Sequence, residues 1–462
     1  MRKSTRTISG VTPLAVMARP VSCPGKCLYC PTYPDAPQSY TPESPAVIRA
    51  RTCDYDARRQ VELRLQVFEE MGHPTDKIEL IIMGGTFLAQ PEDYQHRFVR
   101  DCYDGLNGTD SPTLEAAKKY NETARHRCTG LCIETRPDWC GQAEIQRMFE
   151  FGATRVELGV QTLDDDIFRL VGRGHGVAEV ARATALLREH GFKVYYHWMP
   201  GLPGSTPEKD LEMSRRLFED TRFRPDGLKL YPTMVVAGTG LESWYREGRY
   251  VPYDDDIMVK LIIGIKSIVP EYVRISRVLR DIPSKFIVAG LKDSLRDVVR
   301  DRMKRDGVEC RCTRCREYGH RVRDGRKTGA PRLVRRDYDA SGGTEVFLSF
   351  EDDGGTLFGL LRLRLQPGPV PALRHLDNGK SAVIRELHVF GPEVPLSEKR
   401  SEAAQHKGLG KALLLEAERI ARDEFRSGRM FVLSGTGARE YYRESGYTLQ
   451  GDYMVKELGT LA

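Results

Sequence analysis

The chain has 462 residues, of which 40% are hydrophobic and 29% charged, a composition typical of a globular protein with two or three domains. It contains no run of about 18 apolar residues, and its charged N-terminus lacks the apolar segment of a secretory signal, so we expect neither a membrane span nor secretion. Because neither is expected, the protein should be cytosolic, and its 11 cysteines should stay reduced. The net charge of +6 is modest for a chain of this length.

The first motif along the chain is a short loop with three cysteines, Cys23, Cys27 and Cys30, at C-x3-C-x2-C spacing. Three thiolates can hold a [4Fe-4S] cluster and leave its fourth iron open for S-adenosylmethionine (SAM), which is the pattern of radical SAM enzymes. The alternatives are a zinc site that lacks its fourth ligand and thiols without a metal. We favour the cluster.

Short apolar strands alternate with amphipathic helices from about residue 55 to 290. We expect strands at 78–83, 131–135, 155–160, 193–198, 227–231 and 272–276, and helices at 56–71, 92–107, 141–151, 163–170, 177–190, 207–220 and 255–268. This alternation predicts parallel strands joined by right-handed crossovers, in a partial or full (β/α) barrel.

Polar residues and glycines follow several of these strands, at the edge where such barrels carry their active sites. A pair of glycines after the first of them would let a ligand approach the backbone closely. Each residue alone could be a buried polar group with its partners satisfied, but together they favour a pocket. They are Gly84, Gly85, Thr86, Glu134, Arg136, Gln161 and His197.

Residues 291–336 interrupt the alternation. Between residues 296 and 336, 15 Lys and Arg stand against 6 Asp and Glu, which is typical either of a segment that binds nucleic acid or of a solvated linker. Three cysteines here could bind a structural zinc ion, with His320 as a candidate fourth ligand. Free thiols on a flexible arm are the alternative. The cysteines are Cys310, Cys312 and Cys315.

The pattern changes again from residue 337. Antiparallel strands are expected at 344–350, 356–364 and 382–390, followed by a helix at 410–422, a strand at 430–434, a short helix near 438–445 and a strand near 453–456. The helix is preceded by a glycine-rich turn that frees backbone N–H groups to bind a pyrophosphate. This Q-x-x-G-x-G turn, at Gln405, Gly408 and Gly410, is similar to the acyl-CoA loop of GNAT acetyltransferases.

Two further features support a GNAT-type domain. The strand before the loop, Glu386-Leu387-His388-Val389, would pair with the pantetheine arm, and a downstream tyrosine, Tyr441 or Tyr442, would lie near the thioester. Glu386 is either a base or an inward salt-bridge partner. The two tyrosines are either thioester contacts or packing residues.

Motifs along nearly the whole chain resemble those of the family of Elongator catalytic subunits, which modify the wobble uridine of tRNA. They are Cys-x3-Cys-Leu-Tyr-Cys-Pro, Met-Gly-Gly-Thr-Phe, Ile-Glu-Thr-Arg-Pro-Asp, Gly-Val-Gln-Thr, Ile-Arg-Glu-Leu-His-Val and Tyr-Tyr-Arg-x-x-Gly-Tyr. The resemblance implies an α/β protein with a radical SAM partial barrel followed by a GNAT-type domain, in a stand-alone bacterial or archaeal form. We divide it into a basic arm with the cysteine loop (1–54), the barrel (55–290), a basic linker with a zinc site (291–336) and the GNAT-type domain (337–462).

The resemblance also implies a reaction, that of a tRNA uridine(34) 5-carboxymethyl synthase. A 5′-deoxyadenosyl radical from SAM takes a hydrogen from the methyl group of acetyl-CoA, and the resulting carbon radical adds to C5 of the wobble uridine. Hydrolysis of the thioester then leaves 5-carboxymethyluridine. The anticodon stem-loop of the tRNA would contact the basic segment together with Arg2, Lys3 and Arg6.

Site residues follow from the same resemblance. Catalytic roles fall to Lys77, Glu386, Tyr441 and Tyr442, although Lys77 can also be interpreted as a solvent-facing lysine. The residues expected to bind SAM or acetyl-CoA are Gly84, Gly85, Thr86, Glu134, Gln161, Lys77, Glu386, Leu387, His388, Val389, Gln405, Gly408, Leu409, Gly410, Lys411 and Tyr442.

Two other functions fit the same motifs. A protein lysine acetyltransferase would use the GNAT-type domain with the barrel as a scaffold, and would be active without SAM. A tRNA-binding adaptor with a relic cluster would not turn over acetyl-CoA. The sequence leaves open whether the protein is a monomer or a homodimer, and we expect the two ligand pockets to face each other across the basic segment.

Overall fold

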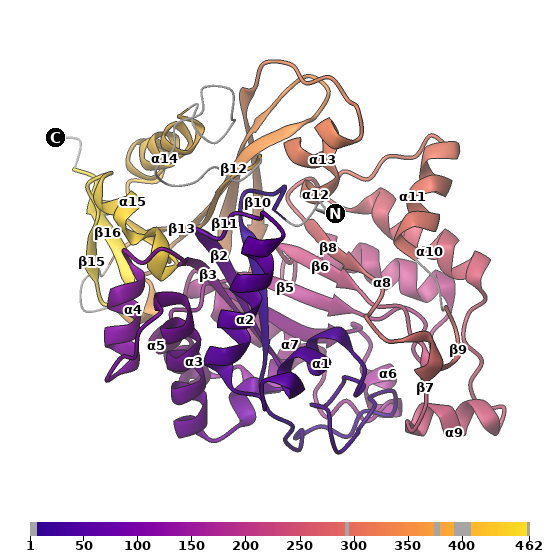
Figure 1. Cartoon of the computed structure of the whole chain (residues 1–462). Helices are drawn as coiled ribbons and strands as arrows, with labels where there is room; N and C mark the ends of the chain where they lie inside the picture. Colours follow the sequence, from indigo (N-terminus) through magenta and orange to yellow (C-terminus); the bar gives the residue numbers. More distant parts are fainter. Residues whose placement is uncertain (1–6, 292–294, 374–378, 392–407, 460–462) are drawn as a thin grey trace.

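The structure is a computed structural model that describes residues 7–291, 295–373, 379–391 and 408–459. Figure 1 shows a larger lobe built from the first two thirds of the chain and a second lobe of curved strands and one long helix. Four residues with expected roles, Arg2, Lys3, Arg6 and Gln405, lie outside the described residues. Within the described ranges, no helix combines the length and the apolar character that crossing a bilayer needs.

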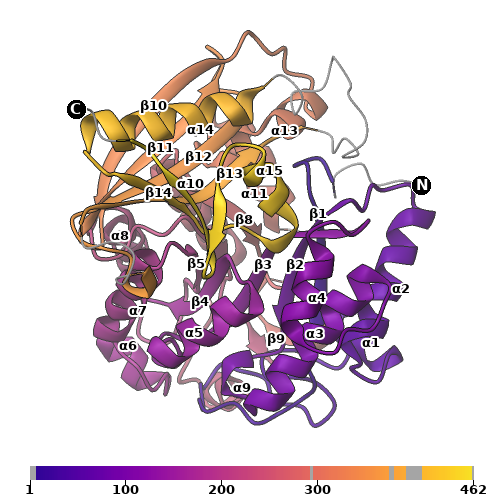
Figure 2. The same ribbon diagram turned by 90° about the vertical axis from the view of Figure 1, so that its left-hand side faces the viewer.

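The first lobe is a parallel sheet with the strand order β1-β2-β3-β4-β5-β6-β8. It curves around an interior and is covered on its outside by helices, which makes it an open (β/α) barrel (Figures 1 and 2). This confirms the predicted fold class for this part of the chain. The strands are β1 (Thr12–Met17), β2 (Lys77–Met83), β3 (Arg127–Thr135), β4 (Arg155–Gln161), β5 (Lys193–Trp198), β6 (Gly227–Leu230) and β8 (Arg274–Val278).

Amphipathic helices between these strands bury their apolar faces against the sheet. Side chains of Asp56, Asp164, Thr206 and Asp254 cap four of them by accepting a hydrogen bond from a backbone N–H of the first turn. The helices are α1 (Pro45–Thr52), α2 (Ala57–Glu70), α3 (Glu92–Asn107), α4 (Leu114–Asn121), α5 (Gln142–Phe151), α6 (Asp165–Leu170), α7 (Val177–Glu189), α8 (Pro207–Glu219), α9 (Gly240–Arg246) and α10 (Asp255–Ile268). A small two-stranded antiparallel sheet pairs β7 (Val235–Val236), which follows β6, with β9 (Ile287–Ala289), which follows β8.

Strand β1, which precedes the cysteine loop, was not predicted from the sequence. It pairs with β2 in parallel and forms the edge of the sheet. Its second residue is Pro13, and proline argues against a strand except at such an edge, where no partner needs its missing N–H.

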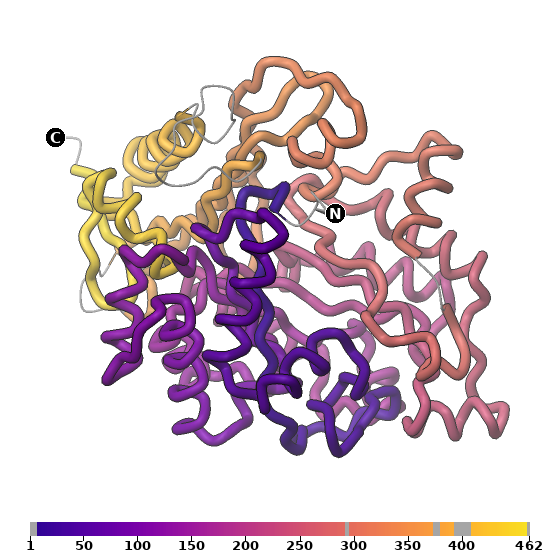
Figure 3. The backbone as a smooth tube through the Cα atoms, in the orientation of Figure 1, coloured from indigo at the N-terminus to yellow at the C-terminus, as the bar shows by residue number. Residues whose placement is uncertain are grey.

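The basic segment is folded rather than extended. It forms α11 (Leu295–Arg305), α12 (Thr313–Arg316) and α13 (Tyr318–Arg323). Leu295 and Val299 are buried, and so are Cys310 and Cys312. The segment therefore packs on the end of the barrel, and the tube in Figure 3 shows it passing from the first lobe into the second.

The second lobe is a largely antiparallel sheet with the order β10-β11-β12-β13-β14-β16-β15, which confirms the predicted GNAT-type architecture. Its strands are β10 (Arg332–Ala340), β11 (Gly343–Glu351), β12 (Leu357–Gln366), β13 (Ser381–Val389), β14 (Arg429–Val432), β15 (Thr448–Gln450) and β16 (Tyr453–Glu457), and its helices are α14 (Leu409–Arg419) and α15 (Arg439–Arg443). Strand β10 was not predicted, because its exposed charged residues give it the composition of a linker.

The two lobes are joined by a buried group of ion pairs. Arg385 of β13 donates to both oxygens of Asp226 at 2.8 Å, just before β6, and also contacts Glu345 of β11 at 2.6 Å. Arg188, at the end of α7, donates to Glu345 at 2.9 Å. All four side chains are at most 1% exposed. Removing one member of such a group leaves a buried charge without its partner, so the group fixes how the lobes dock.

Candidate functional site

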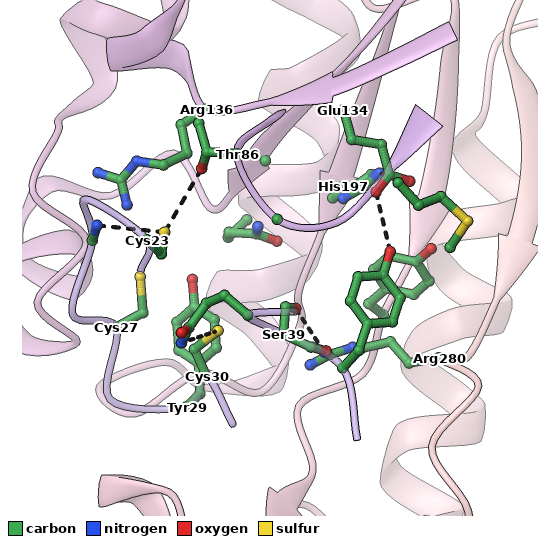
Figure 4. Close-up of a pocket in the computed structure, with 18 of the residues that line it drawn as sticks. Cys23, Cys27, Tyr29, Cys30, Ser39, Thr86, Glu134, Arg136, His197 and Arg280 are labelled. Atoms are coloured by element: carbon green, nitrogen blue, oxygen red, sulfur yellow. Dashed lines mark hydrogen bonds and ion pairs between the residues drawn. The ribbon is translucent and has the colours of Figure 1, made fainter. Parts of the chain in front are cut away.

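A first cavity lies at the C-terminal ends of the barrel strands, beside the cysteine loop (Figure 4). The structure brings together there the three cysteines of the loop and most of the residues that the sequence predicted after the strands. They are Cys23, Cys27, Cys30, Gly85, Thr86, Glu134, Arg136, Gln161 and His197. Gly84 does not line the cavity, but it forms the turn after β2 with φ of 128° and approaches Ala18 so closely that a Cβ would lie 3.1 Å from that residue.

The thiols of the loop are held by donors from different parts of the lobe. Cys27 accepts a hydrogen bond from Arg173 at 3.4 Å, and Cys30 accepts one from Gln38 at 3.4 Å. The backbone N–H of Gly25 donates to the sulfur of Cys23 at 3.4 Å. Arg173 is 6% exposed and lies next to this loop, so a cationic donor faces sulfurs that become anionic when they bind a metal.

The spacing of these sulfurs separates a cluster from a single ion. A tetrahedral zinc ion with bonds of about 2.3 Å needs its sulfur ligands about 3.8 Å apart. The sulfurs of Cys310, Cys312 and Cys315 fall within 4.8 Å of one another, whereas those of the first loop do not form such a group. Ligands of three different irons stand further apart than ligands of one ion. The linker cysteines therefore fit one ion, whereas the sulfurs of the first loop are not placed as ligands of a single ion.

The rim of the first cavity also contains strained backbone. Gln161, the last residue of β4, has φ of 75°, which is rare for a residue with a side chain, and its buried Oε1 accepts no hydrogen bond from the described residues. Arg136 has a buried nitrogen without a partner there as well. Polar atoms left unpaired in a buried cavity indicate a ligand that satisfies them, and SAM carries the amino, carboxylate and hydroxyl groups to do so.

The barrel interior holds a continuous series of opposite charges, which we call the interior ladder. Arg155 pairs with Glu79 and also with Glu157, the latter at 3.4 Å. Lys229 pairs with Glu157 and also with Glu134, the latter at 2.9 Å. The oxygens of Glu134 and Glu157 could bind a metal ion together with His197, but both carboxylates already pair with the Lys229 ammonium, and Glu157 also pairs with Arg155.

A second, larger cavity of ≈ 640 Å³ lies at the opposite, N-terminal ends of the strands, between the two lobes. This size suits a cofactor-sized ligand. The barrel contributes Lys77, Glu79, Arg127, Arg155 and Lys193. The second lobe contributes Glu386, Leu387, His388, Val389, Gly408, Gly410, Lys411, Tyr441 and Tyr442.

The second lobe offers the features of an acyl-CoA site. β13 pairs with β14 only from Ala382 to Ile384, and its remaining residues diverge from that strand and leave backbone groups facing the cavity. Gly408, with φ of 74°, begins α14 and presents the helix N-terminus to the cavity. A Cβ at Gly410 would lie 3.0 Å from the Tyr441 hydroxyl, so this tyrosine stands over the helix start. Leu409 is buried against Phe358 and does not line the cavity.

The first lobe holds the tyrosine-bearing helix α15 in place. Glu122, at the end of α4, accepts hydrogen bonds from Arg439 at 3.1 Å and from Arg443 at 2.8 Å, and these arginines begin and end α15. Burial alone would raise the pKa of Glu122, but donors from Arg443, Lys119 and Arg439 outweigh it and lower the pKa to about 2. Because Tyr441 and Tyr442 lie between the two arginines, this clamp positions them.

The structure also bears on the two interpretations of Glu386. Its Oε1 pairs with Lys193 at 2.8 Å and its Oε2 with Arg362 at 2.7 Å. Burial would raise its pKa, but these two cations hold the pKa far below the usual range. A carboxylate so stabilised is a weak base, and this geometry favours the salt-bridge interpretation.

We had expected the two cavities to face each other across the basic segment, but they do not. The seven residues of β4 separate them, about 20 Å at the rise of a strand. No described residue of 296–336 lines either cavity. The sequence analysis missed Arg155, Lys193 and Glu122, and the only signal for the first two was a cation at the start of a strand.

Three comparisons with known proteins agree with this geometry. The radical SAM superfamily matches residues 19–217, the radical SAM C-terminal domain residues 225–305, and the acetyltransferase (GNAT) family residues 316–447. The chain is 64% identical to the tRNA uridine(34) acetyltransferase of Dehalococcoides mccartyi over 99% of this chain and 100% of that protein. It is 44% identical to human Elongator complex protein 3 over 99% of this chain and 86% of that protein.

A solved structure is similar along nearly the full length. It is the Elp3 of the archaeon Methanocaldococcus infernus with residues 1–46 deleted, and it superposes with a TM-score of 0.86 at 44% identity. The alignment covers 98% of this chain and 100% of that one.

Proposed function

Because the chain belongs to the family of tRNA uridine(34) acetyltransferases and Elongator complex protein 3, we propose that it modifies C5 of the wobble uridine of tRNA with the acetyl group of acetyl-CoA. The product would be 5-carboxymethyluridine. The observation that carries the proposal is the pairing, in one rigidly docked molecule, of a cysteine loop spaced for an iron–sulfur cluster with a CoA-sized cavity. A cytosolic setting, where thiols stay reduced, is part of the proposal.

In the first cavity, Cys23, Cys27 and Cys30 would hold a [4Fe-4S] cluster, which when bound supplies the electron that cleaves SAM to a 5′-deoxyadenosyl radical. The chain itself would bind and orient SAM. The turn at Gly85 and Thr86 offers backbone groups to the amino acid portion, and the unpaired atoms of Gln161 and Arg136 offer polar contacts.

In the second cavity, the N-terminus of α14 and Lys411 would bind the pyrophosphate of acetyl-CoA. The diverging part of β13 would pair with the pantetheine arm, which brings the thioester toward the floor formed by the barrel. Lys77 lies in this cavity, which supports its expected contact with acetyl-CoA. The acetyl group must then cross about 20 Å of barrel interior to meet the adenosyl radical.

The basic segment supplies a surface for tRNA phosphates. Lys304, Arg305, Arg311 and Lys327 are exposed on it, whereas several of its other arginines pair with neighbouring acidic residues. Phosphate contacts release counterions, so affinity for an anticodon stem-loop should fall linearly on a log–log plot against salt. Replacing Lys304, Arg305 and Arg311 by glutamine should reduce that slope by about two to three.

We also propose a structural zinc ion at Cys310, Cys312 and Cys315, whose sulfurs lie close enough for one ion. Hydrogen bonds from Cys310 and Cys315 lower the pKa of the Cys312 thiol, while the pKa of Cys310 and of Cys315 is raised, so Cys312 is the thiol of the three that most readily forms the thiolate a metal binds. His320, the expected fourth ligand, lies 3.0 Å from Glu317 and is not part of the sulfur group. Elemental analysis should find about one zinc per chain, and Cys312→Ser should lose it.

The alternative of a protein lysine acetyltransferase is disfavoured by the position of the barrel. The cavity face opposite α14 is covered by the ends of the barrel strands, with Lys193 and Arg155 in its wall. A lysine side chain from another protein would have to enter where the first lobe already packs.

One assay tests the proposal against both alternatives. Anaerobically reconstituted protein is incubated with tRNA, SAM, dithionite and acetyl-CoA, and the nucleosides are analysed by mass spectrometry. We expect 5-carboxymethyluridine only with all components present. Protein acetylation in the absence of SAM, without any change to uridine, would overturn the proposal, and acetyl-CoA left unconsumed would favour an adaptor.

A further inference from the structure

The reaction proposed above ends with hydrolysis of a thioester, and a base must activate the water. The side chains that line the second cavity differ in how readily they accept a proton. Glu386 has both oxygens occupied by cations. Burial raises the pKa of Tyr441 and of Tyr442, so at neutral pH both hydroxyls keep their protons and neither is present as the phenolate that could act as a base. None of these three can take a proton readily.

His388 is different. It lies on the part of β13 that diverges from β14, two residues after Glu386 and so on the same face of the strand, and it lines the cavity. Its Nε2 lies 2.6 Å from the backbone carbonyl oxygen of Ser9. A carbonyl can only accept, so Nε2 carries the proton and Nδ1 keeps its lone pair. Phe390 stacks on the ring with a centroid distance of 4.5 Å and restricts its rotation.

The carbonyl that orients this ring is itself fixed. The hydroxyl of Ser9 donates to Glu317 at 2.8 Å, and Glu317 accepts from Arg274 of β8 at 2.7 Å. The neighbouring Ile8 presses on α13, where a Cβ on Gly319 would lie 2.5 Å from the Ile8 carbonyl oxygen. The N-terminal turn is thus wedged between the linker and β13. The imidazole is oriented through this turn, as the third member of a catalytic triad orients its base.

The charges around His388 keep it neutral. Burial lowers its pKa, and the cations Lys193 and Arg274 act in the same direction, while the carboxylates Glu386 and Glu79 oppose them. Each nearby carboxylate is itself paired with a cation, Glu386 with Lys193 and Glu79 with Arg155. A neutral imidazole with one fixed donor and one free acceptor is the form that a general base requires.

We infer that His388 is the general base for thioester hydrolysis, an inference that rests on the proposed function. Its Nδ1 takes a proton from water while the water oxygen bonds to the thioester carbonyl carbon. The carbon–sulfur bond then breaks, and the CoA thiolate takes the proton back from His388. The products are a free carboxylic acid and CoA thiol, with no change of oxidation state.

The test uses the full-length holoenzyme and the variant His388→Gln, whose amide can still donate to Ser9 but cannot serve as a base. We expect tRNA-dependent release of CoA thiol to fall by about 10²-fold to 10⁴-fold. Reductive SAM cleavage should stay within threefold, and the affinity for a non-hydrolysable CoA analogue is measured in the same variant so that thiol release is compared at saturating acetyl-CoA. The modified tRNA should then retain the intact CoA thioester on the added carbon, which is visible by mass spectrometry.

The pH profile distinguishes a base from a structural residue. The wild-type hydrolysis rate should decrease as pH falls through a pKa below the ordinary histidine value of about 6.5, and imidazole should restore activity to His388→Ala. His96→Gln, which removes a half-exposed histidine on α3, is the matched control and should leave the rate unchanged.

If the variants do not fold, diethylpyrocarbonate applied to the wild type should modify His388, with loss of thiol release and protection by acetyl-CoA. An unchanged thiol-release rate and pH profile in His388→Gln, or modification of His388 without loss of activity, would overturn the inference. Absence of uridine modification in the wild type itself would instead overturn the proposed function.

Discussion

The two cavities lie at opposite ends of the same parallel strands, yet they are built in different ways. Every residue that lines the first cavity, the proposed SAM site, belongs to the first lobe, between Cys23 and Ile282. The second cavity, the proposed acetyl-CoA site, has one wall from β13, α14 and α15 and the other from the N-terminal strand ends of the barrel. The difference teaches that, under the proposed function, radical generation depends on one lobe, whereas acetyl-CoA binding depends on the docking of two.

The largest effect should come from the cluster loop. Cys27→Ala removes one of the three proposed iron ligands together with the acceptor of Arg173, so SAM cleavage and uridine modification should be abolished. Acetyl-CoA binding should persist, because the loop lies at the other end of the barrel. The measurement is 5′-deoxyadenosine formation beside calorimetric titration with a CoA analogue. Cys53→Ala, at a buried cysteine outside the loop, is the control, and SAM cleavage at the wild-type rate in Cys27→Ala would contradict the comparison.

The interior ladder extends through the barrel from the first cavity to the second, so breaking it should destabilise the barrel as a whole. Lys229→Met leaves Glu134 and Glu157 facing each other without their shared cation, which should lower the free energy of unfolding by about 3–5 kcal/mol. Urea denaturation measures this. Lys209→Met breaks a surface pair with Asp164 and should cost about 0–1 kcal/mol. Equal losses of unfolding free energy in the two variants would show that the interior ladder contributes no more to stability than a surface ion pair does.

Breaking the clamp at Glu122 should affect the second cavity and leave the first unchanged. Glu122→Gln keeps the shape of the side chain but loses the charge that holds Arg439 and Arg443, so α15 should loosen and acetyl-CoA affinity should fall by about tenfold. SAM cleavage should not change. Glu115→Gln, at an exposed position on α4, is the matched control. A drop in SAM cleavage equal to the drop in affinity would mean that the cavities are not independent.

The smallest effect is the pH dependence of the same clamp. The pKa of Glu122 is lowered from 4.5 to about 2 in the folded protein, so its stabilisation is fully present above pH 4.5 and is lost as pH falls toward 2. The difference in stability between wild type and Glu122→Gln should therefore be constant from pH 5 to 8 and shrink below about pH 4. Thermal unfolding across this range measures it, and a constant difference down to pH 2.5 would contradict the lowered pKa.

The sequence predicted the barrel and the GNAT-type lobe because their strands and helices have strong apolar periodicity. It missed β1 and β10 because proline and charge are tolerated at sheet edges, where a strand lacks one neighbour. It found Cys27, Gly85 and Gly410 because each belongs to a local motif whose spacing reflects its chemistry.

What the sequence could not provide were contacts between residues far apart in the chain. Glu122 lies 317 residues before Arg439, and no local pattern links them. Whether Glu386 was a base or an ion-pair partner depended on Lys193, which comes from another lobe. The expected position of the two pockets was wrong for the same reason, since nothing local says at which end of the barrel the second lobe docks.

The interior ladder has a consequence for how this protein can diverge. A substitution at one position of the ladder leaves the neighbouring side chains as buried charges without a partner. The five positions are Glu79, Arg155, Glu157, Lys229 and Glu134. Lineages that alter the series should therefore do so by reciprocal replacements, acid for base on one rung and base for acid on the next. Correlated inheritance of these five positions, far apart in the gene, is the trace that such a constraint would leave.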